Sequence, residues 1–284
     1  MKANFRQGNV EDYKGFVSDA AANKETFTTI SSGLTRTIVF PSGSKAKFFG
    51  SPNGNNIVDG AFLVRMVQKD VDEYIDKHGV PAYTEHRDVQ QFNLSKIREA
   101  IDSKKQVPIL SIDINACYWN VAHNLGYISD SLYKRGLHTC KKEGLLVSIG
   151  CLNKRIVIKE YVQGKLVSTR QDEERMARYA PFYWNVIGKT YELMMQSFEL
   201  FGDRWYMFLT DCVFVDYAKM KEISQWIRSK GFEVKTNTIE FLELSNNRLV
   251  WYDYKAGKRK AIHTLNRDIS SSYAIYKISE RANE

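Results

Sequence analysis

Residues 205–215 constrain the fold more than any other part of the sequence, because they are apolar or aromatic except at Thr210, Asp211 and Cys212. Such a run is typical of buried strands, and its polar interruption predicts a tight turn between two of them. Asp211 is then expected at the turn of a hydrophobic hairpin. A carboxylate in such a place needs a hydrogen bond, an ion pair, a metal ion or a cleft.

A second acidic residue ends another apolar run. Residues 107–113 read as a buried strand that terminates in Asp113. Either Asp taken alone is most simply a turn residue. Taken together, carboxylates on neighbouring strands can hold the divalent ions of two-metal phosphoryl transfer, and hard oxygen ligands select Mg²⁺ or Mn²⁺. The sequence therefore predicts that Asp113 and Asp211 lie close together as metal ligands.

The rest of the chain shows alternating helical and strand-like patterns. Apolar residues recur at helical spacing over 60–78, after which Gly79 and Pro81 end the helix. The remaining expected helices cover about 94–103, 130–135 (capped by Ser129 and ended by Gly136), 173–200 (kinked at Pro181) and 219–230. A hairpin is expected at 156–167 and strands at 232–244 and 248–254, residues 145–152 fit either a helix or a strand, and the first 60 residues are expected to be irregular or short-stranded.

This order of elements predicts an α+β fold. From residue 107 it runs strand, helices, strand pair, helix, strand, strand, which favours an antiparallel sheet with helices packed on one face. We expect an N-terminal region of mixed structure over 1–104 and a second domain over 105–284.

Composition narrows the class of protein and its surroundings. With 43% hydrophobic and 26% charged residues, the chain is not disordered, collagen-like or a disulfide framework. Its 41 Lys and Arg against 33 Asp and Glu give a net charge of +8, which favours a polyanionic partner. The four cysteines lie in no metal-binding spacing, and neither an apolar leader nor a membrane-spanning run is present. These features predict reduced thiols, no membrane association and a cytoplasmic location.

The residues around the two acids resemble motifs of family B DNA polymerases. Residues 113–120 (DINACYWN) are similar to the first palm motif, D-x-x-S-L-Y-P-S, and residues 209–215 (LTDCVFV) to the second carboxylate motif, D-T-D-S-x-F-V. The resemblance covers about residues 105–262 and implies a polymerase-like palm in which Asp113 and Asp211 are the catalytic metal ligands. It also implies that Asn115 and Tyr118 contact the nucleotide, with Tyr118 beneath its sugar.

The same resemblance assigns roles to residues further along the chain. Residues 234–244 look like the palm strand with an accessory acid, so Glu240 or Glu243 would assist, and Glu240 would be a third metal ligand. Residues 141–150 loosely resemble the fingers motif, K-x-x-x-N-S-x-Y-G, which implies that Lys141 and Lys142, or Arg135 instead, bind the triphosphate. The segment with Tyr254, Lys258, Arg259 and Lys260 is similar to the basic segment that touches the primer or template backbone.

Departures from the family pattern leave several functions open. Leu209 replaces the first Asp of D-T-D, the fingers Asn and Tyr are absent, and the chain has no room for a proofreading exonuclease or a full thumb. The leading hypothesis is a compact nucleotidyltransferase, viral by analogy and so in the host cytoplasm. It would act on nucleoside triphosphates and a nucleic acid, with DNA as the preferred one. A partner protein would supply the polymerase elements that this chain lacks. The alternatives are a degenerate palm that binds nucleic acid or serves assembly, and an RNase H-like two-metal nuclease.

Overall fold

The computed structural model of the chain describes residues 5–32, 35–49, 56–86, 89–103, 108–265 and 267–269. The chain forms two compact units, the first from Met1–Tyr83 and Leu125–Trp184, the second from Thr84–Asn124 and Asn185–Glu284. The expected boundary at residue 104 is therefore not where the chain divides. Residues 125–184 group with the N-terminal region because one of their strands, β7 (Ile156–Val162), pairs with β2 (Phe27–Ser32).

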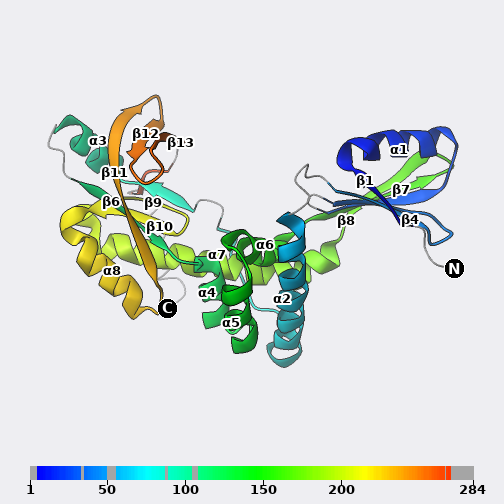
Figure 1. The fold of residues 1–284 in the computed structure, drawn as a ribbon, viewed down its shortest axis with the longest axis horizontal. Coiled ribbons are helices and arrows are strands. Elements are labelled where there is room, and N and C mark those ends of the chain that lie inside the picture. Colours follow the sequence, from blue (N-terminus) through cyan, green and yellow to red (C-terminus); the bar gives the residue numbers. More distant parts are fainter. Residues whose placement is uncertain are drawn as a thin grey trace. The chain divides into compact units, whose positions relative to one another are not determined.

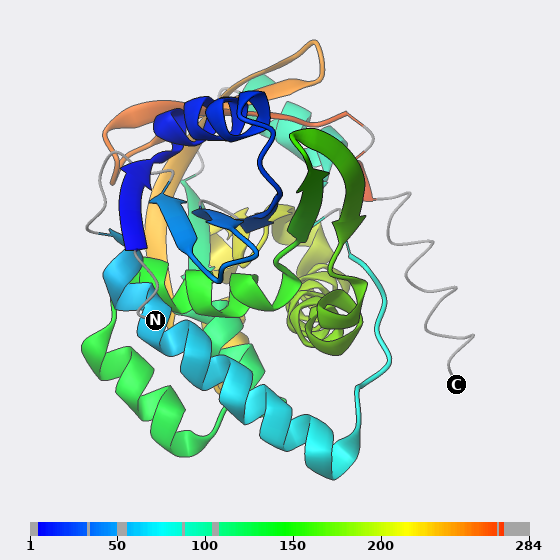
Figure 2. The same cartoon turned by 90° about the vertical axis from the view of Figure 1, so that its right-hand side faces the viewer.

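The first unit contains a six-stranded sheet in the order β1-β4-β3-β2-β7-β8, antiparallel except for the β1–β4 pair. Its other strands are β1 (Phe5–Asn9), β3 (Thr35–Val39), β4 (Lys45–Phe49) and β8 (Lys165–Gln171). Helix α1 (Val10–Ala22), which the sequence pattern did not predict, lies across one face of this sheet (Figure 2). Phe16 and Val17 of the helix pack there against buried Phe27, Ile38 and Phe48.

The predicted hairpin at 156–167 is confirmed as β7 and β8. Gln163 and Gly164 form its two-residue turn, and both have positive φ angles, 48° and 77°, as a type I′ turn requires. A Cβ atom on Gly164 would lie 2.1 Å from the carbonyl oxygen of Ala21. Both the turn and the close approach to α1 therefore require glycine at this position.

Helices make up the rest of the first unit: α2 (Asn56–His78), α5 (Asp130–Thr139), α6 (Lys142–Gly150), the short η1 (Cys151–Asn153) and residues 173–184 of α7 (Glu173–Phe201). Leu63, Val67 and Val71 recur at i, i+4 on α2 and are fully buried, as the helical pattern predicted. Residues 145–152 are mostly helical, which settles the alternative that the sequence left open. Ser129 caps α5 as predicted, but that helix continues past Gly136 to Thr139.

The second unit contains a seven-stranded antiparallel sheet in the order β13-β12-β11-β6-β10-β9-β5 (Figure 1). The strands are β5 (Gln90–Phe92), β6 (Ile109–Ile114), β9 (Trp205–Leu209), β10 (Cys212–Asp216), β11 (Val234–Ser245), β12 (Arg248–Asp253) and β13 (Lys258–His263). The strand runs expected at 107–113, 205–215, 232–244 and 248–254 are all present. β13 is an additional strand that was expected only as a basic segment.

Helices cover both faces of this sheet, so the expectation of helices on one face alone is wrong. Helix α8 (Met220–Ser229) and α3 (Leu94–Asp102) lie on opposite sides of it (Figure 1). Residues 185–201 of α7 also pack on the sheet: Phe198 meets the Trp205 ring edge-on, and Ser197 accepts a hydrogen bond from the Trp205 indole at 3.2 Å. The second unit further contains α4 (Cys117–Asn124) and the short helices η2 (Gly202–Arg204) and η3 (Tyr217–Lys219).

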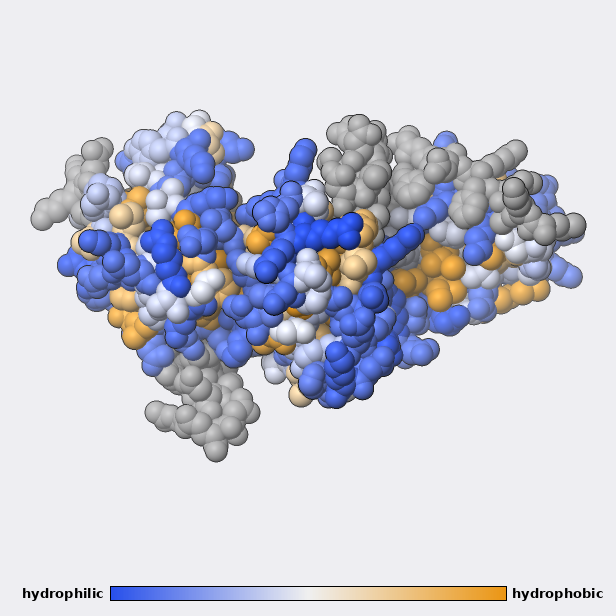
Figure 3. Space-filling model, turned by 60° about the horizontal axis from the view of Figure 1, so that its bottom comes forward, coloured by the Kyte–Doolittle hydropathy of each residue, from blue (hydrophilic) through white to orange (hydrophobic). Residues whose placement is uncertain are grey.

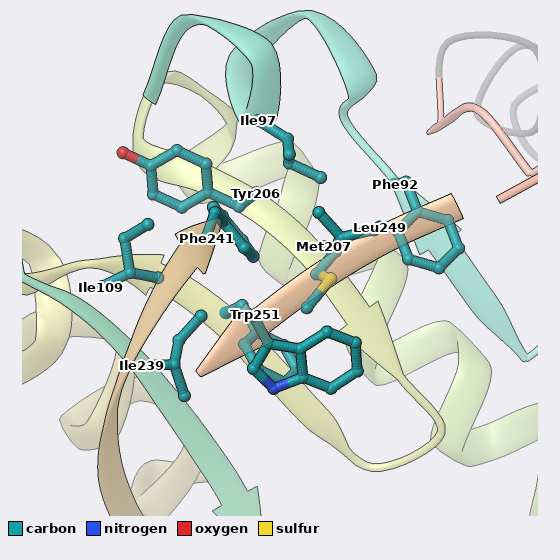
Figure 4. Close-up of a cluster of buried hydrophobic side chains, with 10 residues drawn as sticks. Phe92, Ile97, Ile109, Tyr206, Met207, Ile239, Phe241, Leu249 and Trp251 are labelled. Carbon is teal, nitrogen blue, oxygen red and sulfur yellow. The ribbon is translucent and has the colours of Figure 1, made fainter. Parts of the chain in front are cut away.

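The face that bears α3 is called here the inner face, and it carries an apolar cluster. Side chains from α3, β5, β6, β9, β10, β11 and β12 meet in this cluster (Figure 4). The ring centroids of Trp251 on β12 and Phe214 on β10 lie 6.3 Å apart, although β11 and β6 separate these strands in the sheet order. The sheet must therefore curl, which brings β12 over β10 on the inner face.

The described surface is mixed in character. Among the described residues, no helix combines the length and apolar composition needed to cross a bilayer. Hydrophilic residues predominate on the face drawn in Figure 3, with apolar ones scattered between them. Exposed apolar side chains of this kind are ordinary for a folded protein.

Candidate active site

Asp113 and Asp211 lie at the same end of the second-unit sheet. Asp113 is the penultimate residue of β6 and stands directly opposite Cys212, the first residue of β10. Asp211 occupies the turn between β9 and β10, and its carbonyl oxygen accepts a hydrogen bond from the Ile114 amide at 3.1 Å. The structure thus brings together the two acids that the sequence singled out.

The turn that carries Asp211 is tight, as predicted. Thr210 has a φ angle of 61°, which is unusual for a β-branched residue. Its amide donates to the carbonyl oxygen of Val89 at 2.8 Å, and this bond ties the turn to the segment that precedes β5. Strained backbone is often found where a fold holds a side chain for function.

The Cys212 thiol reports on the charge at this end of the sheet. Burial raises its pKa well above the usual value, and the nearby carboxylates of Asp113 and Asp211 raise it further. Ser111 and Lys260 act in the opposite direction, through a hydrogen bond and a positive charge. Both carboxylates therefore act on one thiol, which indicates a local concentration of negative charge.

This geometry makes a measurable prediction. Replacing Asp113 or Asp211 with Asn removes a negative charge that disfavours the thiolate, so either variant is expected to lower the pKa of Cys212. The pH dependence of Cys212 alkylation, followed by peptide mass spectrometry, measures this change. Asp203→Asn, an exposed acid with no influence on this thiol, serves as the control. An unchanged alkylation profile in both site variants would contradict the shared environment.

Asn115 and Tyr118 follow β6 at the entrance to α4. Ala116 turns the chain with a φ angle of 46°, and the side-chain Nδ2 of Asn120 donates to the Asn115 carbonyl oxygen at 2.7 Å. The side-chain Oδ1 of Asn115 is buried, and no described group donates a hydrogen bond to it. A buried acceptor without a donor is uncommon in a folded protein. Tyr118 is half-buried on the first turn of α4.

Glu240 is not brought to the two aspartates. Lys235 of β11 is the residue opposite Asp113, and Glu240 lies five residues further along the strand, roughly 17 Å away at 3.3 Å per residue. Its carboxylate accepts a hydrogen bond from the Tyr254 hydroxyl at 2.7 Å. Glu243 lies further still. The role of Glu240 as a third ligand beside Asp113 and Asp211 is therefore not supported by its position.

Lys258, Arg259 and Lys260 do not form one cluster, because they alternate along β13. Lys258 and Lys260 project to the inner face with Ile262, while Arg259 projects to the other face. Arg259 stands opposite Tyr252, and the rings of Tyr252 and Tyr254 meet edge-on at 5.0 Å. The sequence could not separate these cations because β13 was not recognised as a strand.

Asp253 is a site residue that the sequence reasoning missed. It is 7% exposed, and its carboxylate accepts hydrogen bonds from Lys260 Nζ, from Asn237 Nδ2 at 2.7 Å and from the Ala256 amide at 2.9 Å. Burial alone would raise the pKa of Asp253, but these donors lower it below the usual value. The aromatic run that precedes Asp253 was the available signal, since it marks a buried strand ending in an acid, as at Asp113.

Lys141 and Lys142 lie together in the first unit, at the start of α6. Lys141 is the N-terminal capping residue and Lys142 the first helical residue, and both side chains are exposed. Arg135, the alternative triphosphate ligand, lies on α5 with its guanidinium 4.2 Å from the centre of the Phe62 ring. All three cations therefore lie in the first unit.

Comparisons with known proteins add no family assignment. No protein-family model matches the chain, and no curated protein matches its sequence.

Proposed function

We propose that the second unit is a polymerase-like palm that transfers nucleotidyl groups to the end of a nucleic-acid strand. The observation that carries this proposal is the meeting of Asp113 and Asp211 at one end of an antiparallel sheet, beside the turn that begins α4. Motif resemblance and the net charge of +8 support it, since the substrates are polyanions.

The residues at this end of the sheet fit a bound Mg²⁺ or Mn²⁺ ion. Mg²⁺ commonly keeps several waters and is held by one or two carboxylates together with substrate phosphates. Asp113 and Asp211 supply two carboxylates of that kind. Among the described residues no group of three His, Cys, Asp or Glu side chains gathers, so phosphate oxygens and water would complete the coordination. A pair of such ions, if held there, would supply activation of the attacking oxygen and support for the leaving group.

The chain's own residues would then position the substrates. In the reaction, the terminal hydroxyl of the strand loses its proton to water, its oxygen forms a bond to the α-phosphorus of the triphosphate, and the bond to pyrophosphate breaks. Asn115 Oδ1 would supply a buried acceptor for a substrate donor, and Tyr118, on the first turn of α4, would supply the ring beneath the nucleotide sugar. The role of Lys141 and Lys142, or of Arg135 instead, in binding the triphosphate stays a prediction from the resemblance, because these residues belong to the first unit.

One observation favours a second function, a degenerate palm that binds nucleic acid without catalysis. Leu209 ends β9 directly opposite Cys212, so an apolar side chain occupies the position at which the family pattern has an acid. The site then has only two of the carboxylates expected by resemblance. An incomplete ligand set weakens metal affinity, and the protein would retain binding alone.

An incorporation assay separates these functions. The purified chain is offered primed DNA, primed RNA or unprimed templates with nucleoside triphosphates and either Mg²⁺ or Mn²⁺. Metal-dependent extension supports the proposal, and binding without extension or cleavage supports the degenerate palm. Cleavage without extension would instead indicate a two-metal nuclease.

A further inference from the structure

The two faces of the first-unit sheet differ in how far their side chains are buried. On the face that α1 covers, Phe27, Ile38 and Phe48 are only 2%, 0% and 4% exposed. Thr28 and Ile30 alternate with Phe27 along β2 and therefore point to the other face, where both remain partly exposed. This second face, away from α1 in Figure 1, is called here the open face.

The centre of the open face is aliphatic. Ile30 of β2 stands opposite Thr37 of β3 and Ile158 of β7, so these three side chains share the face. The other aliphatic residues on it are Val39 and Ile156, which are half-buried, and Val162, which is 47% exposed. The right-hand part of Figure 3 shows apolar residues bordered by hydrophilic ones on this side of the first unit. An apolar sheet face is typically packed against a second layer of structure.

Cations lie on both sides of this aliphatic centre. Strand register places Lys45 and Lys47 of β4 on the open face, together with Lys165 and Arg170 of β8. Among the described side chains of the face the one acid is Glu160, whose carboxylate lies 3.9 Å from Arg170 Nε. Four cations less one acid give the described part of the open face a net charge of +3.

This layout is that of a protein interface rather than a nucleic-acid surface. Protein interfaces combine an apolar core with a polar or charged rim. Surfaces that bind single-stranded nucleic acid use aromatic rings on which bases stack, whereas the centre of the open face consists of aliphatic side chains. The phosphate backbone of a duplex would pair with the cations but would leave the aliphatic centre without an apolar partner.

One amphipathic helix matches the dimensions of the open face. β2 lies midway between β4 and β8, two strands from each, so the cations on either side are roughly 10 Å from its axis at about 4.8 Å per strand. An α-helix with its side chains is about 10–12 Å across. A helix lying along β2 would therefore cover the aliphatic centre, and acidic residues along both margins of its apolar stripe would reach the cations.

The charge of the chain itself argues against an occupant from the same sequence. A second copy carries a net charge of +8, which the cations of the open face would repel. The C-terminal residues 270–284 contain two acids against two cations, so they lack the acidic excess that this face requires. The occupant that matches both the aliphatic centre and the cations is an acidic helix of another protein.

We propose that the open face binds an amphipathic helix of a partner protein, whose apolar stripe packs on Ile30 and Ile158 and whose acidic margins pair with the cations of β4 and β8. The bound helix would cover the open face as α1 covers the opposite one. This inference does not depend on the proposed function, because it concerns the sheet of the first unit alone.

A panel of four synthetic peptides tests the inference on the full chain. Each is a fluorescein-labelled, helix-forming peptide of about five turns, and binding is measured by fluorescence anisotropy. Three peptides share a leucine stripe at positions i, i+3, i+4 and i+7 and carry Glu, Lys or Gln along its margins. The fourth keeps the composition of the Glu peptide but scrambles the stripe. The Glu peptide is expected to bind roughly tenfold more tightly than each of the others.

Variants of the chain then assign this binding to the open face. Lys45→Glu combined with Lys165→Glu reverses one exposed charge on each side of the aliphatic centre, and it should weaken binding of the Glu peptide roughly tenfold. Ile158→Thr keeps a β-branched residue in β7 but removes apolar surface, so it is expected to weaken binding severalfold. Lys14→Glu, a matched reversal of an exposed charge on α1, should leave the affinity unchanged.

The outcomes separate the two kinds of partner. If no peptide binds, or if the Glu peptide and its scrambled form bind equally, the inference is overturned. Equal affinity of the Glu peptide for the unaltered chain and for the Lys45→Glu, Lys165→Glu variant would also overturn it. A labelled DNA strand and its duplex are measured on the same two proteins. If DNA binding depends on Lys45 and Lys165 while peptide binding does not, the open face is a nucleic-acid surface instead.

Discussion

Replacing Asp211 with Asn is expected to abolish metal-dependent nucleotide incorporation, with a loss of roughly 10³-fold or more. The amide keeps the shape of the side chain but lacks the charge that holds a divalent ion. Such an ion supplies several kcal/mol of transition-state stabilisation, and each 1.36 kcal/mol corresponds to tenfold in rate. The effect should be large because Leu209 leaves this end of the sheet with few acids, so the remaining two must suffice.

The measurement is single-turnover extension of a primed template over a range of Mg²⁺ and Mn²⁺ concentrations. Asp203→Asn removes the same charge from an exposed residue in η2 and should extend at the unaltered rate. The hydrogen bond from Ile114 to the Asp211 main chain is retained in the site variant, so its fold is expected to persist. Full activity in Asp211→Asn would exclude this residue as a metal ligand and end the two-carboxylate proposal.

The elements that the sequence predicted are those set by local pattern. The apolar run broken by Thr210 and Asp211 is a β-hairpin because side chains buried on both faces favour strands, and a short polar break leaves room only for a turn. Ser129 caps a helix because its hydroxyl accepts from the Leu132 amide, a bond that depends on neighbours in sequence. The pairing of Asp113 with the Asp211 turn follows from two such runs sharing one sheet.

The features that sequence reasoning missed depend on long-range pairing. β7 belongs to the N-terminal sheet because Ile158 pairs with Ile30. The local sequence pattern does not predict this pairing. Glu240 was assigned to the metal because residues 234–244 resemble the palm strand with an accessory acid, but strand register, which only the structure gives, places it far from Asp113. Lys258 to Lys260 looked like one cation cluster because consecutive residues are neighbours in sequence, whereas a strand sends them to opposite faces.

Asp253 shows how a buried acid can be missed when its partner is distant. Its neighbours in sequence, Tyr252 and Tyr254, were interpreted only as aromatic residues beside the basic segment 258–260. The residues that hold it come from β11 and β13, so its role is visible only once the hairpins are paired. The same holds for Asn115, whose unsatisfied acceptor follows from burial in the turn before α4.

Trp251→Ala is expected to destabilise the second unit by about 3–5 kcal/mol, the usual cost of removing a large buried aromatic side chain. Trp251 is 5% exposed and meets Phe214 across the inner face, so its loss leaves a cavity where β12 lies over β10. Urea unfolding followed by tryptophan fluorescence measures the change, since four of the five tryptophans, all but Trp184, belong to this unit. Trp226→Ala on α8 makes the same chemical change at a half-buried position and should cost less.

Trp251→Phe keeps an aromatic ring against Phe214 and should cost less stability than Trp251→Ala. Equal losses of stability in Trp251→Ala and Trp226→Ala would show that the Trp251–Phe214 contact does not hold the curl of the sheet.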